Sequence, residues 1–229
     1  MLVRFATEPA PGQAQNEDGV LASAIAVVAD DHDGKCDLTN PATPAATATL
    51  VREQGNRLEY LVLCDGLLVV DDGDEVSLIT DLRFERAVAG IRRDHLTREE
   101  AIDSPEHAAR VLDAVLRKQQ LTNTPAGYWI AAANPEAASH AVTGALPLTG
   151  HKAIRRAALL TDGASRAVDL FGMFDWRHML DLLEANDPQT LIHLVREAER
   201  ADHDGRDKPR FKRHDDATVA MVTFSTKGN

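Results

Sequence analysis

Three acidic segments are the parts of this chain best suited to chemistry. Asn16-Glu17-Asp18 lies near the N-terminus, Asp162-Gly163 follows the apolar residues 157–160 after one threonine, and Asp215-Asp216 precedes the apolar residues 219–222 by two residues. Loops at the ends of strands often carry site residues on a rigid scaffold. If the two apolar segments are neighbouring strands, Asp162 and Asp215 meet at one rim of a sheet.

Carboxylates that meet in this way repel one another and raise one another's pKa, unless a cation lies between them. Oxygen ligands of this kind suit Mg²⁺ or Mn²⁺ rather than Zn²⁺. A single Asp-Gly after a strand is usually a turn, and a single Asp before a strand is usually a solvated loop residue. The prediction of a metal site therefore rests on the order of all three segments along the chain.

Strands are expected to position these segments. Four runs with strand character follow one another with short turns between them: Ala46–Arg52, Leu58–Leu63, Leu67–Asp71 and Glu75–Thr80. This spacing predicts an antiparallel meander. Further strands are expected at Leu2–Thr7, Tyr128–Ala133, Ala157–Thr161 and Thr218–Phe224.

Helices are expected on either side of the strands. Thr97–Leu121 has a helical pattern with Thr97 as its N-cap, and Ser104-Pro105 divides it. Its apolar residues predict one buried stripe: Ala108, Val111, Leu112, Val115 and Leu116. Asp187-Pro188 starts another helix that runs to about Ala201. Grouped strands flanked by helices predict one α+β domain over residues 1–229.

Composition limits the classes of partner. The formal net charge is −11, and a field of that sign repels nucleic acid. No apolar run approaches the roughly 18 residues of a membrane span, so no membrane is expected as a partner. Cys36 and Cys64 are too few for a disulfide framework and have no metal-like spacing. A cytoplasmic location with reduced thiols is the resulting expectation.

The order of these motifs resembles that of the type 2C (PPM-type) metal-dependent protein phosphatases, including the bacterial members of that family. The resemblance is carried by five segments: Asn16-Glu17-Asp18, the Ala-Ala-Thr-Ala-Thr-Leu run around Thr47, Tyr60–Gly66 with Leu78–Asp81, Leu159–Gly163, and His214–Thr218. It covers nearly the whole chain. No single segment is specific, but five in family order are fairly specific.

The resemblance implies a four-layer αββα sandwich with a pair of Mn²⁺ or Mg²⁺ ions at one rim. A metal-activated water would then attack a phosphoserine or phosphothreonine of a phosphoprotein substrate. Asp162 and Asp215 would be direct ligands of one metal. Glu17 and Asp18 would hold metal-bound waters, which makes both catalytic candidates and places Asp18 among the metal candidates. Asp216 stands where the family usually has asparagine.

One departure concerns the substrate phosphate. The family has an arginine four residues before the glutamate of the first motif, and here that position is Gln13. Glutamine is neutral and cannot make a bidentate ionic contact with phosphate. Arg210 and Lys212, in the basic run before Asp215, are the predicted phosphate-binding replacements, although a solvated loop is the plainer interpretation.

A second departure concerns the aspartate that bridges both metals in the family. Only 28 residues separate Asp18 from Thr47. Either Val27–Asp30 is the bridging motif, with Asp30 as a metal ligand, or Ala24–His32 is the end of a helix and the motif is absent. In both alignments part of one helical layer is missing. The sandwich face left exposed would then suit a protein partner.

Two functions remain open at this point. The first is a metal-dependent phosphoserine/phosphothreonine phosphatase, favoured by the carboxylates Glu17, Asp18, Asp162 and Asp215. The alternative is a catalytically inactive phosphatase-like module that binds a partner, favoured by Gln13 and by the uncertain bridging aspartate.

Overall fold

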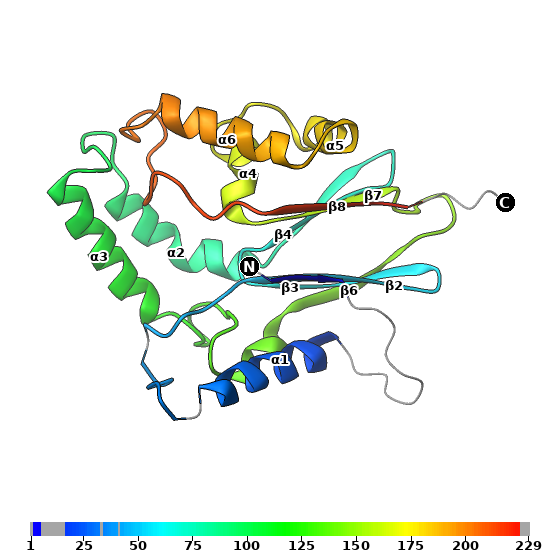
Figure 1. Cartoon of the computed structure of the whole chain (residues 1–229), viewed down its shortest axis with the longest axis horizontal. Helices are drawn as coiled ribbons and strands as arrows, with labels where there is room; N and C mark the ends of the chain where they lie inside the picture. The colour runs from blue at the N-terminus through cyan, green and yellow to red at the C-terminus, as the bar shows by residue number, and fades with distance from the viewer. Residues whose placement is uncertain (1, 6–16, 33, 41, 225–229) are drawn as a thin grey trace.

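The strands of the protein form two sheets that lie face to face (Figure 1). The computed structural model describes residues 2–5, 17–32, 34–40 and 42–224, with side chains from residue 18 onward. The first sheet has the order β1 (Leu2–Phe5), β2 (Ala48–Gln54), β3 (Arg57–Leu63) and β6 (Val142–Pro147). The second has the order β5 (Val76–Ile79), β4 (Leu67–Asp71), β7 (Arg156–Leu160) and β8 (Val219–Thr223). β1 runs parallel to β2, and the other strand pairs are antiparallel.

The predicted antiparallel meander is wrong at its centre. β2 pairs with β3 and β4 pairs with β5, but β3 and β4 belong to different sheets. At the end of β3, Cys64 has a φ of 64°, a left-handed conformation that few residues other than glycine adopt. This sharp change of direction carries the chain from one sheet to the other.

One hydrophobic core fills the space between the sheets. Leu58 and Val62 of the first sheet pack with Leu68 and Leu159 of the second, and all four side chains are buried. Successive side chains of a strand point to opposite faces. Val69, the neighbour of Leu68, therefore belongs to a second core on the outer face of the second sheet.

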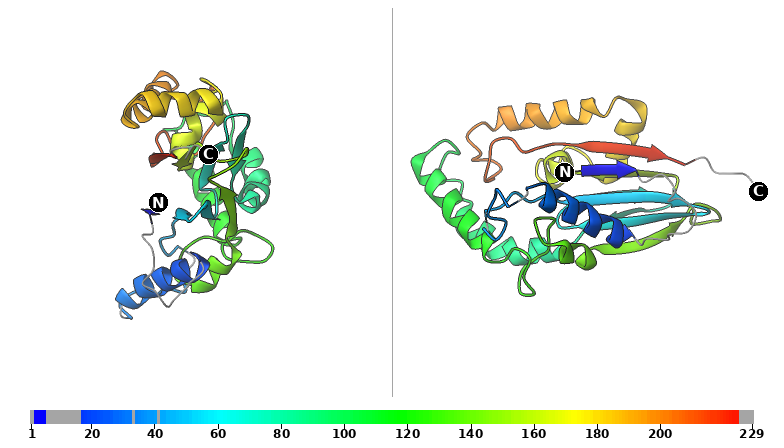
Figure 2. Two further views of the ribbon diagram at one scale, coloured as in Figure 1. Left: turned by 90° about the vertical axis from the view of Figure 1, so that its right-hand side faces the viewer. Right: turned by 60° about the horizontal axis from the view of Figure 1, so that its bottom comes forward.

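Helices cover the outer face of each sheet (Figures 1 and 2). The first sheet carries α1 (Glu17–Asp31) and a 3-10 helix, η1 (Pro135–His140). The second sheet carries α4 (Asp162–Asp169), α5 (Trp176–Ala185) and α6 (Gln189–Ala201). The α+β class expected from the sequence is therefore confirmed. Residues 27–30 lie within α1, which agrees with the alternative in which Ala24–His32 ends a helix.

Two further helices, α2 (Leu82–His95) and α3 (Pro105–Gln119), pack together at one end of the sheets (Figure 1). Ser104 caps α3, as its place before a proline predicts, and Thr97 starts no helix. The predicted buried stripe is largely wrong, since Leu112 and Leu116 are 61% and 51% exposed. α3 instead buries the face that contains Ala114.

Two strand assignments also need correction. Residues 128–133, expected as a strand, contribute only isolated bridges, between Thr122 and Tyr128 and between Ala46 and Ala131. On the side away from β2, β3 pairs with β6, a strand that the sequence analysis did not identify. None of the helices in the described ranges is long and apolar enough to cross a membrane.

Candidate metal centre

Three aspartates adjoin strand ends on the side of the sandwich where α2 and α3 lie. Asp162 follows β7 as the first residue of α4, Asp215 lies in the segment that leads into β8, and Asp65 follows β3. β7 and β8 are hydrogen-bonded neighbours, with Leu160 opposite Val219. The expectation that Asp162 and Asp215 leave and enter neighbouring strands is therefore confirmed.

Thr161 and Gly163 hold the two strand ends together. The Thr161 hydroxyl donates to the Asp216 carbonyl at 2.9 Å and accepts from the Thr218 N–H at 3.0 Å. A Cβ at Gly163 would lie 2.4 Å from the Asp216 carbonyl oxygen and 3.1 Å from the Asp215 Cβ. Only glycine allows so close an approach. The close contact between the segment that carries Asp162 and the segment that carries Asp215 therefore requires glycine directly after Asp162.

Replacing Gly163 with alanine is expected to lower the free energy of unfolding by about 1–3 kcal/mol, because a backbone carbonyl must move to make room. Urea denaturation measures the change. Gly19→Ala is the matched control, since a Cβ there meets no atom within 4 Å. That variant should equal or exceed wild type by up to about 1 kcal/mol, from helix propensity alone. Equal stability of Gly163→Ala and wild type would contradict the close contact.

The negative charge of Asp162 is repelled by neighbouring carboxylates and only partly offset by the charge of Arg166. Crowding by neighbouring atoms, and then the charges of Asp215 and Asp65, raise the pKa of the Asp162 carboxyl to about 6, against an ordinary 3.8. Its side chain is open to solvent at the rim, so water screens part of this repulsion. Its carboxylate accepts from the Gly163 N–H and forms no ion pair with any residue that the structure describes.

Asp65 is the third member of the cluster. Burial raises the pKa of its carboxyl, a hydrogen bond from Cys64 and the positive charge of Arg92 oppose the shift, and the charge of Asp215 adds to it. The carboxylate forms no ion pair with a described residue. The sequence analysis did not identify Asp65 as a site residue, although it follows an apolar strand and precedes a glycine, as Asp162 does.

Asp215 differs from the other two because cations hold it. Arg166 of α4 donates to Asp215 Oδ2 at 3.0 Å, and Lys212 contacts the other carboxylate oxygen. Arg166 also contacts Glu199 of α6, whose side chain is fully buried. Arg196 joins Glu199 to the Asp215 carbonyl. The loop that presents Asp215 is thus fastened to α4 and α6 by a charged network.

The repulsion at Asp162 predicts an unusual dependence of stability on pH. Asp162→Asn is expected to raise the melting temperature of the metal-free protein at pH 7.5 by about 2 °C, because a repelled charge is removed. The folded pKa of about 6 lies above the unfolded 3.8, so wild type takes up a proton in the folded state as pH falls between them. The advantage of asparagine should therefore shrink at pH 5. Melting curves in EDTA at both pH values test this, and a lower melting temperature for asparagine at pH 7.5 would contradict it.

The three carboxylates fit a hard divalent cation in donor type, since Asp162 and Asp65 offer oxygen ligands and lack a cationic partner among the described residues. No group of three or more acidic, histidine or cysteine side chains within the described ranges already stands at ligand spacing. Mg²⁺ commonly binds through one or two carboxylates and keeps several waters. The described residues therefore suit one water-rich ion rather than a fully enclosed pair.

A scan against protein-family models and a search of curated proteins both return no match for this chain.

The other predicted ligands lie elsewhere on the fold. Glu17 and Asp18 begin α1, and Asp30 lies in its last turn, on the outer face of the first sheet. Asp162 and Asp215 adjoin the second sheet. The structure therefore does not show Asp18 or Asp30 beside the cluster, and their metal roles stay predictions. The Glu17 side chain and Gln13 lie outside the described residues.

The two predicted phosphate-binding residues differ sharply. Arg210 is 4% exposed, and its guanidinium donates to the Asp202 carboxylate and to the carbonyls of Glu199 and Asp202. It closes the loop after α6, which argues against a contact with phosphate. The Lys212 side chain is 62% exposed and forms a surface pair with Asp215, so it stays a candidate.

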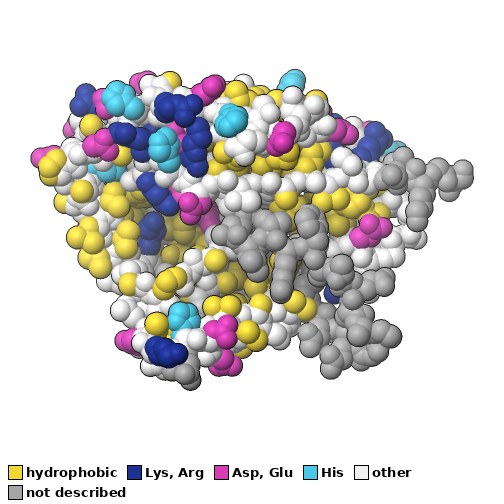
Figure 3. All heavy atoms as spheres, in the orientation of Figure 1, with side chains coloured by type: hydrophobic (Ala, Val, Ile, Leu, Met, Phe, Trp, Pro, Cys, Tyr) yellow, Lys and Arg dark blue, Asp and Glu magenta, His cyan; other side chains and the backbone are white. Residues whose placement is uncertain are grey.

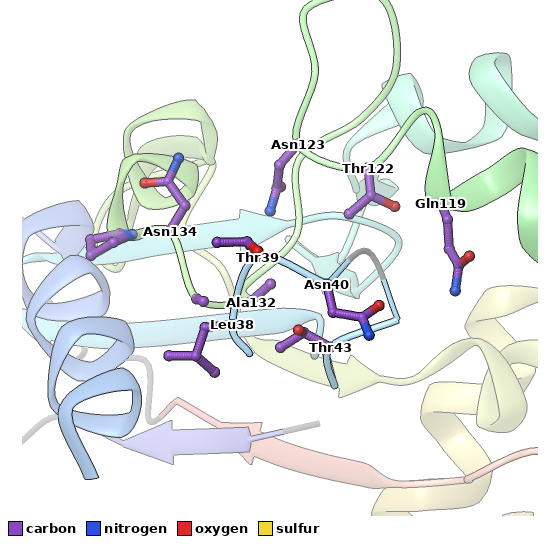
Figure 4. A pocket seen from close by; sticks show the side chains of 11 residues that line it. Leu38, Thr39, Asn40, Thr43, Gln119, Thr122, Asn123, Ala132 and Asn134 are labelled. Atoms are coloured by element: carbon purple, nitrogen blue, oxygen red, sulfur yellow. The ribbon is translucent and has the colours of Figure 1, made fainter. Parts of the chain in front are cut away.

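A separate pocket of about 550 Å³ lies beside the end of α3 (Figure 4). Asn and Thr side chains line it, among them Thr39, Asn40, Asn123 and Asn134, and no charged residue does. Several of these side chains already bind nearby backbone groups. Asn123 Oδ1 accepts a hydrogen bond from the Ile130 N–H, and Asn134 Oδ1 accepts one from the Glu136 N–H. This pocket suits neither a metal nor a phosphate.

Proposed function

We propose that this protein is a divalent-cation-dependent phosphomonoester hydrolase of the type 2C phosphatase kind, acting on phosphoserine or phosphothreonine in proteins. The observation that carries the proposal is the acidic cluster, in which Asp65, Asp162 and Asp215 follow or precede strands of both sheets. Asp162 is repelled by Asp65 and Asp215, and neither Asp65 nor Asp162 forms an ion pair with a residue in the described ranges. A bound Mn²⁺ or Mg²⁺ would relieve this repulsion.

The layered arrangement of the fold supports the same proposal. Two facing sheets with helices outside each are compatible with the αββα sandwich that the motif order implies, and β7 and β8 bring Asp162 and Asp215 to one rim. A single outer α-helix, α1, lies on the first sheet among the described elements. This agrees with the proposal that part of one helical layer is missing from the chain.

The reaction would be hydrolysis of a phosphoester. The oxygen of a water molecule bonds to phosphorus, the bond from phosphorus to the seryl or threonyl oxygen breaks, and that oxygen leaves with a proton. A bound Mn²⁺ or Mg²⁺ makes such a water acidic enough to act as the nucleophile near neutral pH. Asp162 and Asp65 would hold the ion. Arg166 would keep Asp215 in place, with Glu199 behind it.

Metal-dependent hydrolysis of 4-nitrophenyl phosphate and of a phosphothreonine peptide tests the proposal. The full chain should release phosphate with Mn²⁺ and lose this activity in EDTA. Activity that is the same with and without metal would contradict it, as would no hydrolysis of either substrate at any Mn²⁺ concentration.

A second function, an inactive module that binds a partner, is favoured by two observations. Asp215 is already neutralised by Arg166 and Lys212. The outer surface also presents exposed apolar side chains, with Val27 and Val28 of α1 each 60% exposed and Leu112 of α3 61% exposed. Under this function the phosphatase assay gives no metal-dependent signal.

A further inference from the structure

Lys118, in the last turn of α3, is a partly buried cation without a counter-ion in the described part of the chain. Its Nζ lies 5.1 Å from the centre of the Phe211 ring, and this ammonium group forms no hydrogen bond or ion pair with any described residue. Lysine carries three donors on its ammonium group. A protein with a net charge of −11 has ample carboxylates to pair with it, so the lack of one here calls for an explanation.

The surroundings of Lys118 are fixed from two sides. His107 of α3 contacts the Phe211 carbonyl through Nε2 at 3.0 Å, which ties the loop before β8 to the helix. Phe211 directly precedes Lys212, whose ammonium contacts Asp215 of the acidic cluster. Lys118 thus lies over the ring of Phe211, and the next residue in the chain, Lys212, contacts a candidate metal ligand.

The positive charges around Lys118 favour the binding of an anion. Burial, followed by repulsion from Arg92 and Lys212, lowers the pKa of Lys118, while Asp65 and Asp215 oppose the shift. Arg92 of α2, Lys118 of α3 and Lys212 of the loop before β8 thus repel one another through their charges. In the space-filling view, Lys and Arg side chains gather over the end of α6 and the loop that follows it, and continue into the recess beside α3 (Figure 3).

We propose that Lys118 and Lys212 bind the phosphoryl group of the substrate, in the role that Gln13 cannot fill. This inference rests on the proposed function and adds the residues that capture its substrate. A phosphomonoester dianion would satisfy the unused donors of Lys118 and neutralise the repulsion between the two ammonium groups.

The other basic side chains nearby are less available. Arg210 is buried and fully bonded within its loop. Arg92 pairs with Glu85 and lies over the Phe84 ring. Lys212 also has a partner, Asp215, but the Lys212 side chain is 62% exposed and Asp215 keeps its second cation, Arg166, so Lys212 can turn toward a phosphate.

The experiment combines binding and kinetics on the full chain. Binding of inorganic phosphate is measured by calorimetry in low salt, with and without Mn²⁺, and KM and kcat are measured for 4-nitrophenyl phosphate. The variants are Lys118→Met and Lys212→Met, which keep the length of the stem and remove the charge. Lys208→Met is the matched control, because it lies in the same basic run and its side chain forms no hydrogen bond or ion pair with a described residue. Melting curves verify that each variant is folded.

Lys118→Met and Lys212→Met should each weaken phosphate binding and raise KM by about 10- to 100-fold, the usual effect of losing a hydrogen bond to a charged group. Lys208→Met should stay within about twofold of wild type. If the chain hydrolyses the aryl phosphate but the KM values of all variants agree, the inference fails and the proposed function stands. If the chain binds phosphate through Lys118 without hydrolysing the ester, the anion site stands and the proposed function fails. Absence of both phosphate binding and hydrolysis would overturn both.

Discussion

Replacing Glu199 with alanine is expected to lower the free energy of unfolding by about 3–5 kcal/mol and the melting temperature by about 10 °C. Glu199 is fully buried and contacts Arg166 at 2.5 Å, Arg196 at 2.6 Å and His214 at 2.7 Å. Burial alone would raise its pKa, but these three contacts outweigh burial and the pKa is lowered. Removing the carboxylate would leave Arg166, which is buried, short of a partner.

Glu197→Ala on the same helix is the matched control, because its side chain is exposed and forms no ion pair with a residue in the described ranges. Its stability should stay within about 0.5 kcal/mol of wild type. Urea denaturation of the three proteins measures the difference. A loss of less than about 1 kcal/mol in Glu199→Ala would show that the network does not fasten the Asp215 loop.

Asp162→Asn is expected to lower the Mn²⁺-dependent rate of aryl phosphate hydrolysis by at least about 100-fold. Changes to residues that only support a metal ligand already cost about 10- to 100-fold, and Asp162 is proposed as a ligand itself. The asparagine side chain keeps the size of the carboxylate and loses its charge. The same variant should be slightly more stable without metal, so a loss of activity cannot be ascribed to unfolding.

Asp216→Asn makes the same chemical change at the next aspartate in sequence after Asp215. Its side chain is exposed, and the contact from Thr161 reaches only its backbone carbonyl. Activity of this variant should stay within about twofold of wild type. Equal losses in Asp162→Asn and Asp216→Asn would point to a general effect of surface charge rather than to a ligand.

The strands at the centre of the fold were the easiest to predict, because β4 and β7 are buried along almost their whole length and β3 over its second half. Leu58–Leu63, Leu67–Asp71 and Ala157–Leu160 are nearly continuous apolar runs, and such runs keep their strand character in any pairing. The sequence did not show which of these strands pair with one another in the same sheet. A tight hairpin and a crossing between facing sheets look alike in sequence, and the left-handed backbone of Cys64 has no signal in its residue type.

Helices with few buried residues were harder to predict. α2 buries Val88, Ile91 and His95 and little else. The charged residues between them interrupt the apolar spacing from which a helix is predicted. α3 was found, but its buried side was predicted wrongly. Its apolar stripe faces away from the rest of the described chain, and periodicity shows which side is apolar without showing what covers it.

The candidate site also contains some residues that could be predicted from the sequence and others that could not. Asp162 and Asp215 could be predicted because each directly adjoins an apolar strand, and β7 and β8 are neighbours. Asp65 has the same signal, an apolar strand followed by Asp-Gly, and could have been found by the same rule. The sequence could not predict the roles of Arg166, Glu199 and Lys118, because these roles depend on contacts between elements far apart in the chain.

Equilibrium binding of Mn²⁺ to the full chain tests the central claim most directly, because it requires no knowledge of the substrate. Electron paramagnetic resonance counts the free ion during titration of wild type, Asp162→Asn and Asp216→Asn at pH 7.5. We expect wild type and Asp216→Asn to bind Mn²⁺ with similar affinity, and Asp162→Asn to bind at least about tenfold more weakly. Equal binding by all three proteins, or no binding by wild type, would contradict a metal site at Asp162.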